Sequence, residues 1–363
     1  MIGGRGRSAP RLLPALPVVL LALLAGGCGG GGDEGSGGEP ALPRAGDPGT
    51  RFGYSEAFLP GTGEIDTLAR AGSEIARRRL SWTEIEPAQG APDWRRYDAI
   101  YDELLAKGIR PLWLFVDAPC WARLPDPACL HNVPARAPGV EHAADLGAFL
   151  AEVAERYPES LGIEVGNEVN DERFWVGGLN PNDYAYLLGT AADAVHAADP
   201  EMKVVASGLA PFEQAGPGRL PWEDFVRAII HSGAAEKIDA FAFHPYPPGA
   251  AEQVAAAVEL EQVAFESYLD AKGYGDVPVW VTEIGVTTVG PDAPTPEQQA
   301  IDLTGILERL EARGTPVVAF HRLQDEVVPG DPLEAGFGVI AADGVTPKPA
   351  FCAIAGLRDS PCP

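Results

Sequence analysis

Short apolar runs alternate with longer amphipathic segments along most of the chain. The runs are rich in β-branched and aromatic residues and are bounded by Gly, Pro or charged residues, a pattern typical of buried strands. They lie at residues 51–54, 75–82, 110–116, 162–168, 203–208, 238–244, 278–284 and 316–321. Helical segments between successive runs favour parallel strands, because a helix can carry the chain back to the starting end of a sheet.

In the segments between these runs, apolar residues recur at intervals of three and four, the spacing of helices that bury one face. Clear cases are residues 94–108, 141–157 and 182–200, and several segments end in KG or DP, as helices often do. Eight strands alternating with helices predict an α/β fold, a single (β/α)8 TIM barrel. A doubly wound open sheet is the alternative, but no Gly-rich nucleotide fingerprint follows the first strand.

The N-terminal segment has the features of an export signal. Arg5, Arg7 and Arg11 precede the apolar run LLPALPVVLLALLAGG, which is short for a membrane span and ends at Cys28. Its end, LLAGGC, resembles the lipobox of bacterial lipoproteins, which implies a signal peptide at 1–27 and lipidation of Cys28. We therefore expect export and lipid anchoring to the bacterial cell envelope. A secretory signal cut before Cys28, giving a secreted protein, is the alternative.

Residues 28–50 are rich in Gly, Pro and acidic residues and lack apolar periodicity, which predicts a flexible tether. The folded part is expected at 51–363, without an internal repeat. Of the 363 residues 46% are hydrophobic, enough for the core of one large α/β domain or two small ones.

The formal net charge is −25, from 52 acidic and 27 basic residues. Nucleic-acid binding needs a basic face, so this balance argues against a nucleic-acid partner. We interpret the charge as a solvated acidic surface that keeps the protein soluble, and it leaves the oligomeric state open.

Five cysteines are present, one of them in the lipobox-like segment. The other four form two close pairs along the chain, and an exported protein would be expected to oxidise them. The economical pairing joins Cys120 to Cys129 and Cys352 to Cys362. The sequence leaves the two other connectivities open.

Two glutamates end predicted strands that would lie on opposite sides of an eight-stranded barrel. Glu168 ends the fourth strand in IEVGNEVN, and Glu283 lies at the end of the seventh in VWVTEIG. Because active sites of such barrels gather at the C-terminal ends of the strands, the two carboxylates can meet across the mouth. Glycoside hydrolysis uses such a pair. One group protonates the leaving oxygen, and the other attacks the anomeric carbon or activates water.

At these residues the sequence resembles the retaining (β/α)8 hydrolases of glycoside hydrolase clan A, over residues 51–357. GNE looks like the clan's Asn-Glu motif and WVTEIG like its nucleophile strand, while GFGVIAADGVTPKPAF resembles its closing segment. The resemblance implies that Glu168 is the acid/base, Glu283 the nucleophile, and Asn167 a ligand of the sugar 2-hydroxyl. The cellulase-like family five and the xylosidase-like family thirty-nine are similar, and we do not rank them.

Further substrate-site residues follow from the same resemblance. ARRRLSWTEIEPAQG looks like the clan's second-strand region, so Arg77 would hold the nucleophile. Arg79 shares the strand face of Arg77 and stays an alternative, whereas Arg78 should face the helices. HPY resembles the sixth-strand segment, which implies contacts of His244 or Tyr246 with the nucleophile.

Two aromatic residues and one backbone feature complete the expected site. Trp121 and Trp175 follow the third and fourth strands, where loops over the mouth begin, and aromatic faces stack on sugar rings. The end of the eighth strand departs from the clan, since His321 follows Phe320 where members often carry a Trp. If side chains along this strand alternated strictly, only one of Asn167 and Glu168 would point into the barrel. We therefore expect a local bulge at this point.

Other chemistries lack their motifs in this sequence. No HExxH metal set, G-x-S-x-G elbow or phosphate loop is present. We therefore expect a glycosidase that hydrolyses O-glycosyl bonds of a β-linked oligo- or polysaccharide by double displacement, with no cofactor. The alternative is a saccharide-binding surface lipoprotein on the same barrel that does not cut.

Overall fold

The computed structural model describes residues 49–56, 60–123, 136–247, 253–328, 331–360 and 362. These residues belong to one compact unit, Gly46–Pro363. The expected signal peptide, Cys28 and nearly all of the expected tether lie outside the described residues, as does Cys129. The expectations for those segments therefore stay predictions.

Eight strands close a barrel in chain order, and each pairs in parallel with its neighbours, β1 with β8 included. The strands are β1 (Arg51–Glu56), β2 (Ile75–Ser81), β3 (Arg110–Asp117), β4 (Gly162–Asn167), β5 (Val204–Leu209), β6 (Ala240–Phe243), β7 (Val279–Ile284) and β8 (Val317–Phe320). Each coincides with a predicted strand. The closed ladder confirms the single TIM barrel and rules out the open sheet.

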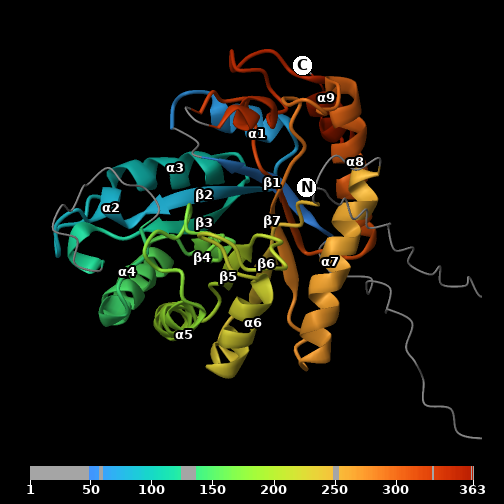
Figure 1. Cartoon of the computed structure of the whole chain (residues 1–363). Coiled ribbons are helices and arrows are strands. Elements are labelled where there is room, and N and C mark those ends of the chain that lie inside the picture. Colours follow the sequence, from blue (N-terminus) through green and yellow to red (C-terminus); the bar gives the residue numbers. More distant parts are fainter. Residues whose placement is uncertain are drawn as a thin grey trace, which may run out of the picture. The chain divides into compact units, whose positions relative to one another are not determined.

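Helices follow the strands and surround the barrel, as Figure 1 shows. The α-helices are α1 (Glu64–Arg70), α2 (Trp82–Ile85), α3 (Arg95–Ala106), α4 (Ala143–Arg156), α5 (Pro181–Ala198), α6 (Trp222–His231), α7 (Val254–Ala271), α8 (Pro296–Ala312) and α9 (Pro349–Leu357). Short 3-10 turns are η1 (Cys120–Ala122), η2 (Val140–His142), η3 (Ala234–Glu236) and η4 (Pro332–Gly336). Within the described ranges, none of the helices has the length and apolar character needed to cross a membrane.

The starts of α5 and α8 show why these segments become helical where they do. The side chains of Asn180 and Thr295 accept hydrogen bonds from free backbone N–H groups in the first turns of the two helices. A proline follows each cap, at the first helical position, where no N–H is needed. The three helices predicted most clearly, α3, α4 and α5, are confirmed.

The inside of the barrel is divided into an apolar and a polar layer. One buried cluster, here called the apolar layer, fills the N-terminal half and consists of Ile75, Leu112, Leu161, Val205, Ala240, Ala242, Trp280, Val317 and Ala319. Toward the C-terminal ends of the strands the buried inward residues are polar, among them Arg77, Glu164 and Thr282. The polar groups of the site therefore lie directly above the apolar layer, where charges interact more strongly than in water.

Extra residues interrupt three ladders near the C-terminal end of the barrel. On β7, Val281 pairs with Val318 and Ile284 with Phe320, so β7 carries one residue more than β8 over this stretch. Similar shifts occur in the β5–β6 and β2–β3 ladders. Such bulges re-aim side chains and are common beside active sites. On β7 the extra residue allows Thr282 and Glu283 both to turn inward.

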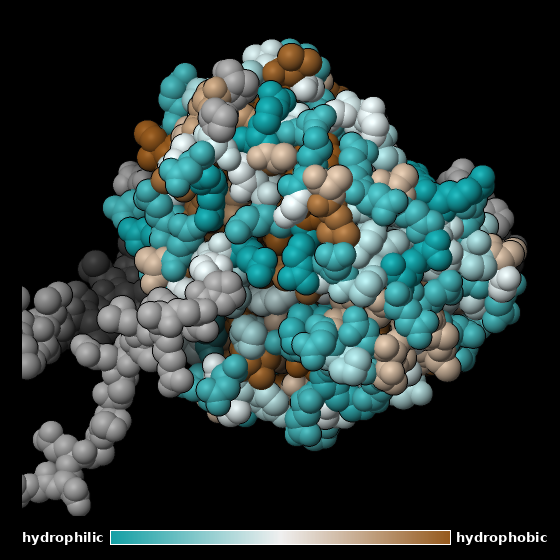
Figure 2. All heavy atoms as spheres, turned by 180° about the vertical axis from the view of Figure 1, so that it is seen from behind, coloured by the Kyte–Doolittle hydropathy of each residue, from teal (hydrophilic) through white to brown (hydrophobic). Residues whose placement is uncertain are grey.

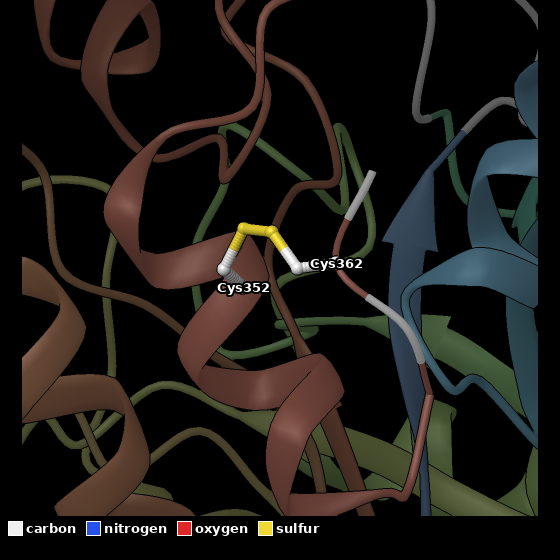
Figure 3. The surroundings of a disulfide bond; sticks show 2 residues. All are labelled: Cys352 and Cys362. Carbon is white, nitrogen blue, oxygen red and sulfur yellow. A yellow bond between two sulfur atoms is a disulfide. The ribbon is translucent and has the colours of Figure 1, made fainter.

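The C-terminus is tied to α9 by a disulfide between Cys352 and Cys362, whose Cα atoms lie 4.9 Å apart (Figure 3). This is one of the two predicted pairs. Cys120 is also disulfide-bonded, but its predicted partner Cys129 lies outside the described residues, so that pairing stays a prediction. The face drawn in Figure 2 is mainly hydrophilic, as the strongly acidic composition leads one to expect.

Candidate active site

Glu283, at the end of β7, is held by a side chain from within β2 and by side chains from just after β6 and β8. Arg77 of β2 donates through Nη1 to its Oε2 at 3.0 Å, and the Tyr246 hydroxyl donates to its Oε1 at 3.2 Å. Nδ1 of His321, just after β8, lies 3.3 Å from the same Oε1, a distance that makes an ion pair without good hydrogen-bond direction. The carboxylate remains 13% exposed, so it is fixed in place and still open to the mouth.

Glu168, directly after β4, reaches the same mouth through unusual backbone angles. Gly166 has φ +96° and Glu168 φ +40°, both in the left-handed region. A Cβ on Gly166 would lie 2.5 Å from a methyl of Val169, so only glycine fits there. The ladder from Val165 to Asn167 stays in register with β5, so the prediction of a bulge at this point is wrong. The turn of the backbone has the same effect, because it brings Asn167 and Glu168 into one site.

His244, just after β6, supports Glu168 from below. Its Nδ1 lies 3.0 Å from Oε1 of Glu168, and its Nε2 lies 3.2 Å from the hydroxyl of Thr282. The ring is fully buried, so His244 acts on the site through Glu168 and does not offer a surface for a ligand. Gly208 makes room for it, since a Cβ there would lie 2.0 Å from Nε2.

The two glutamates face each other closely. One side-chain ligand atom from each of Glu168, His244 and Glu283 lies within 4.8 Å of the other two. Three such atoms could approach a metal ion. Arg77 and His321 already place positive charge on Glu283, so the electrostatics do not favour a further cation. The arrangement suits a pair of carboxylates that acts on one bond held between them.

A buried ion pair beneath the carboxylates was not predicted from the sequence. Glu164, in the middle of β4 and fully buried, accepts two hydrogen bonds from Arg77, at 2.7 and 2.9 Å. Its oxygens also accept from the backbone N–H of Gly208 and the hydroxyl of Thr282. Arg77 in turn donates to Oδ1 of Asn167 at 2.7 Å. Glu164 thus fixes the guanidinium that orients both Glu283 and Asn167.

This result decides between the two candidate arginines. Arg77 is 1% exposed and contacts Glu283, whereas Arg79, one turn of the pleat further along β2, is exposed. Arg78 faces the helices as predicted, with its guanidinium 5.6 Å from the ring centre of Tyr97 on α3.

Glu283 and its neighbours Tyr246 and His321 shift one another's pKa values. Burial by itself would raise the pKa of Glu283, but the interactions with His321, His244 and Arg77, in that order, outweigh it and hold that pKa well below the ordinary value. Burial and the negative charge of Glu283 raise the pKa of Tyr246 well above 10, so its hydroxyl stays a donor. Burial would lower the pKa of His321, yet Glu283 and Glu334 raise it to about 10.

The segment after β8 adds a second charged cluster to the site, formed by His321, Arg322 and Glu334, and its contacts were not predicted from the sequence. Nε2 of His321 lies 2.9 Å from Oε2 of Glu334, in η4, and Nε of Arg322 lies 3.0 Å from the same oxygen. His321 also meets the edge of Phe337, with ring centres 4.9 Å apart. The only sequence signal was negative, the histidine at a position where the resembled clan often has a tryptophan.

The two tryptophans expected at the mouth differ from each other. Trp175 is 1% exposed and packs edge-on against Phe115 and Tyr184, so it belongs to the core and its predicted contact with a ligand is wrong. Trp121, in η1, is partly exposed and donates through Nε1 to the backbone carbonyl of Glu86. Its predicted role as a sugar platform stays a prediction.

A hollow of about 600 Å³ lies beside the segment that follows Glu168 in the chain. It is lined by Asp171, Glu172, Arg173, Phe212, Pro217, Gly218 and Arg219. The N–H of Asp171 donates to the carbonyl of Glu168 at 2.7 Å, so the wall of the hollow begins one turn after Glu168. Part of its wall belongs to the segment between β5 and α6.

No protein-family model matches the chain, and no curated protein matches it. Solved structures do match. A monomeric β-xylosidase from Caulobacter crescentus CB15 has a TM-score of 0.65 and 21% identity, over 88% of this chain and 69% of that one. A family 39 glycoside hydrolase from Bacteroides cellulosilyticus WH2 gives 0.63 and 20%, over 85% of this chain and 63% of that one.

A GH5_18 protein from Streptomyces cattleya, in complex with Manb1-4GlcNAc, gives a TM-score of 0.61 and 19% identity, over 86% and 83% of the two chains. The present chain spans less than two thirds of the length of the family 39 enzyme. At these identities the similarity establishes the barrel fold.

Proposed function

We propose that this chain is a glycoside hydrolase that cleaves O-glycosidic bonds of a β-linked saccharide with retention. The observation that carries the proposal is that one carboxylate oxygen of Glu168 and one of Glu283 lie within 4.8 Å of each other. Retaining enzymes hold their two carboxyl groups about 5–5.5 Å apart, whereas inverting enzymes leave about 6.5–9.5 Å for a water. Glycoside hydrolases among the matching folds add support.

In the first step Glu283 is the nucleophile. Its low pKa keeps it ionised, and Arg77 and Tyr246 hold it in place, so one oxygen can attack the anomeric carbon. The bond to the departing oxygen breaks as Glu168 transfers its proton to that oxygen. Asn167, fixed by Arg77, is placed to bind a hydroxyl of the same sugar.

In the second step a water attacks the anomeric carbon and gives its proton to Glu168. The ester bond to Glu283 breaks, and its electron pair returns to the carboxylate. His244 holds Glu168 through both steps, at 3.0 Å from Oε1. Two inversions at one carbon give net retention.

The hollow beside Glu168 supports a place for the departing part of the saccharide. Phe212 lies in its wall, with the guanidinium of Arg219 5.0 Å from its ring centre. Arg219 covers one face of this ring, so the opposite face is the one that can stack on a sugar. Phe212→Ala is expected to raise KM for oligosaccharides more than for aryl monoglycosides.

The test uses the full chain purified in detergent and a panel of β-linked aryl glycosides and polysaccharides. We expect Glu168→Ala and Glu283→Ala to abolish turnover and Glu308→Ala, an exposed acid on α8, to leave it unchanged. Azide should rescue Glu168→Ala to a β-glycosyl azide and Glu283→Ala to an α-glycosyl azide. Saccharide binding without turnover by the unmodified chain would contradict the proposal and favour a non-cutting binding protein.

We also propose that the chain is anchored to the cell envelope through a lipid on Cys28. The lipobox-like LLAGGC and the Gly-rich segment after it support this. Membrane fractionation tests it. Cys28→Ala should move the protein out of the membrane fraction, and an unchanged distribution would contradict lipidation.

A further inference from the structure

An imidazole lies between two carboxylates at the mouth of the barrel. Nδ1 of His321 is 3.3 Å from Oε1 of Glu283, and Nε2 is 2.9 Å from Oε2 of Glu334. Both ring nitrogens thus face an anion, and a ring between two carboxylates is favoured in its protonated, positively charged form. The ring is 18% exposed and is kept in place by Phe337.

The packing around His321 depends on a glycine. A Cβ on Gly285 would lie 2.9 Å from Phe337 and 3.1 Å from Cβ of His321, so a larger residue would push this pair of rings apart. The chain therefore reserves space for the ring beside Glu283. This arrangement is more than an incidental surface contact.

We propose that His321 is a positioning residue whose positive charge makes Glu283 a better leaving group, so that it favours breakdown of the glycosyl-enzyme over its formation. The inference rests on the proposed function. It adds that His321 affects formation and breakdown of the glycosyl-enzyme in opposite directions, which the carboxylate pair alone does not imply.

The direction of the effect follows from the charge on Glu283. In the free enzyme Glu283 is an anion, and His321 stabilises it. In the covalent intermediate the carboxylate has become a neutral ester, so this stabilisation is lost. Attack by Glu283 therefore consumes an anion that His321 stabilises, while hydrolysis of the glycosyl-enzyme regenerates this anion. A fixed positive charge slows the first change and speeds the second, because it stabilises the carboxylate as its charge develops.

Other charged groups around His321 are consistent with a lasting positive charge on the ring. Glu283 on β7 and Glu334 in η4 face it directly. Arg322, next in the chain, binds Glu334, and Arg77 on β2 reaches Glu283 through its other oxygen. The two carboxylates outweigh the effect of burial and raise the pKa of His321 to about 10. The ring is thus charged at neutral pH.

The experiment measures the two steps separately on the full chain. The probes are the 2-deoxy-2-fluoro-β-glycosyl fluorides of xylose, glucose, mannose and galactose, which slow both steps and let the labelled enzyme be isolated. Mass spectrometry locates the label, the rate of labelling reports formation of the intermediate, and recovery of activity reports its breakdown. The variants are His321→Gln, which keeps a neutral donor, and His231→Gln, an exposed histidine on α6, as matched control.

We expect recovery to be slower by about tenfold or more in His321→Gln, less than the roughly 100-fold loss of a well-aligned donor, because Nδ1 lacks good hydrogen-bond direction to Glu283. Labelling should be as fast as in the unmodified chain or faster, and His231→Gln should change neither rate. Labelling of Glu283 with equal recovery rates in all three proteins would overturn the role of His321 alone. Absence of label on Glu283 in the unmodified chain would overturn the proposed function and the role of His321 with it.

A second variant serves if His321→Gln does not fold. Glu334→Gln leaves the imidazole in place but removes one of its two anions, so the ring should lose its proton at lower pH. Recovery of the labelled enzyme should then begin to slow at a lower pH than in the unmodified chain. An unchanged pH profile of recovery would overturn the proposal.

Discussion

Replacing Arg77 by methionine tests the buried charge network most directly. The substitution removes the cation from Glu164, which is fully buried and has Arg77 as its charged partner at 2.7 and 2.9 Å. Two unit charges about 4 Å apart interact by about 4 kcal/mol at an effective dielectric constant of about 20. Removing one partner of a buried pair costs about 3–5 kcal/mol, because an uncompensated charge stays behind. We expect Arg77→Met to lower the free energy of unfolding by about this amount.

A double variant separates the stability of the network from its function. In Arg77→Met/Glu164→Gln the orphaned charge is gone, and the glutamine can still accept from the N–H of Gly208. We expect at least half of the lost stability to return. Activity should not return, because Glu283 still lacks the donor to its Oε2, a loss of about 100-fold or more in kcat.

Urea unfolding followed by tryptophan fluorescence gives the free energies, and kcat comes from the best aryl glycoside. A double variant no more stable than Arg77→Met would show that the uncompensated Glu164 charge is not what destabilises the single variant. A double variant with restored activity would show that Arg77 acts on the site only by neutralising Glu164. Either result would refute the reasoning.

Three further predictions concern single positions. Gly208→Ala should displace His244, whose Nε2 lies 2.0 Å from the added Cβ, and lower kcat about tenfold or more, while Gly305→Ala on α8, with an ordinary 3.4 Å contact, should be neutral in the same assay. The raised pKa of His321, about 10, stabilises the fold fully below its unfolded pKa of about 6.5, and this contribution is lost as the pH rises toward 10. The urea midpoint should therefore fall from pH 6 to pH 10 by less in His321→Gln than in the unmodified chain, and equal falls would contradict the pKa shift. Cys352→Ser opens a disulfide that spans 10 residues, worth up to about 2.7 kcal/mol, and should lower the melting temperature with kcat unchanged, whereas a loss of kcat would link α9 to the site.

The barrel could be predicted from the sequence because its strands are covered on both sides. Each appears as a nearly continuous apolar run, and amphipathic helices separate the runs, so both the number and the order of the strands follow. Strand ends were predicted to within a few residues, as at β6, expected at 238–244 and observed at Ala240–Phe243. Hydrophobic periodicity marks the interior of an element better than its end.

The site was only partly predictable, for reasons that differ between residues. Glu168 and Glu283 end strands, and topology alone brings strand ends together. Glu164 had a usable signal, an acidic residue in the middle of an apolar strand, which is costly to bury without a partner. The contact of His321 with Glu334 had none, because the two are joined by a loop whose path depends on tertiary packing.

Trp175 shows the opposite error. Its place after a strand suggested an exposed aromatic ring, but the ring packs over Gly166 and is buried against Phe115. The path of the chain between Glu168 and Trp175, which returns the ring to β4, depends on backbone angles that a linear pattern does not reveal.

The extra residue on β7 has a consequence for how such a site can be lost or gained. Deleting Thr282 would make the β7–β8 ladder regular and leave one inward residue between Val281 and Ile284, so Glu283 would take the place of Thr282 beside Glu164 and His244. The deletion keeps the apolar layer and every other strand, so the barrel could survive it, whereas the carboxylate of Glu283 would leave the mouth. Inserting or deleting one residue in β7 therefore changes the chemistry of the site without changing the fold, more cleanly than any substitution does. Such changes offer a direct evolutionary route between related barrels that cleave a saccharide and related barrels that only bind it.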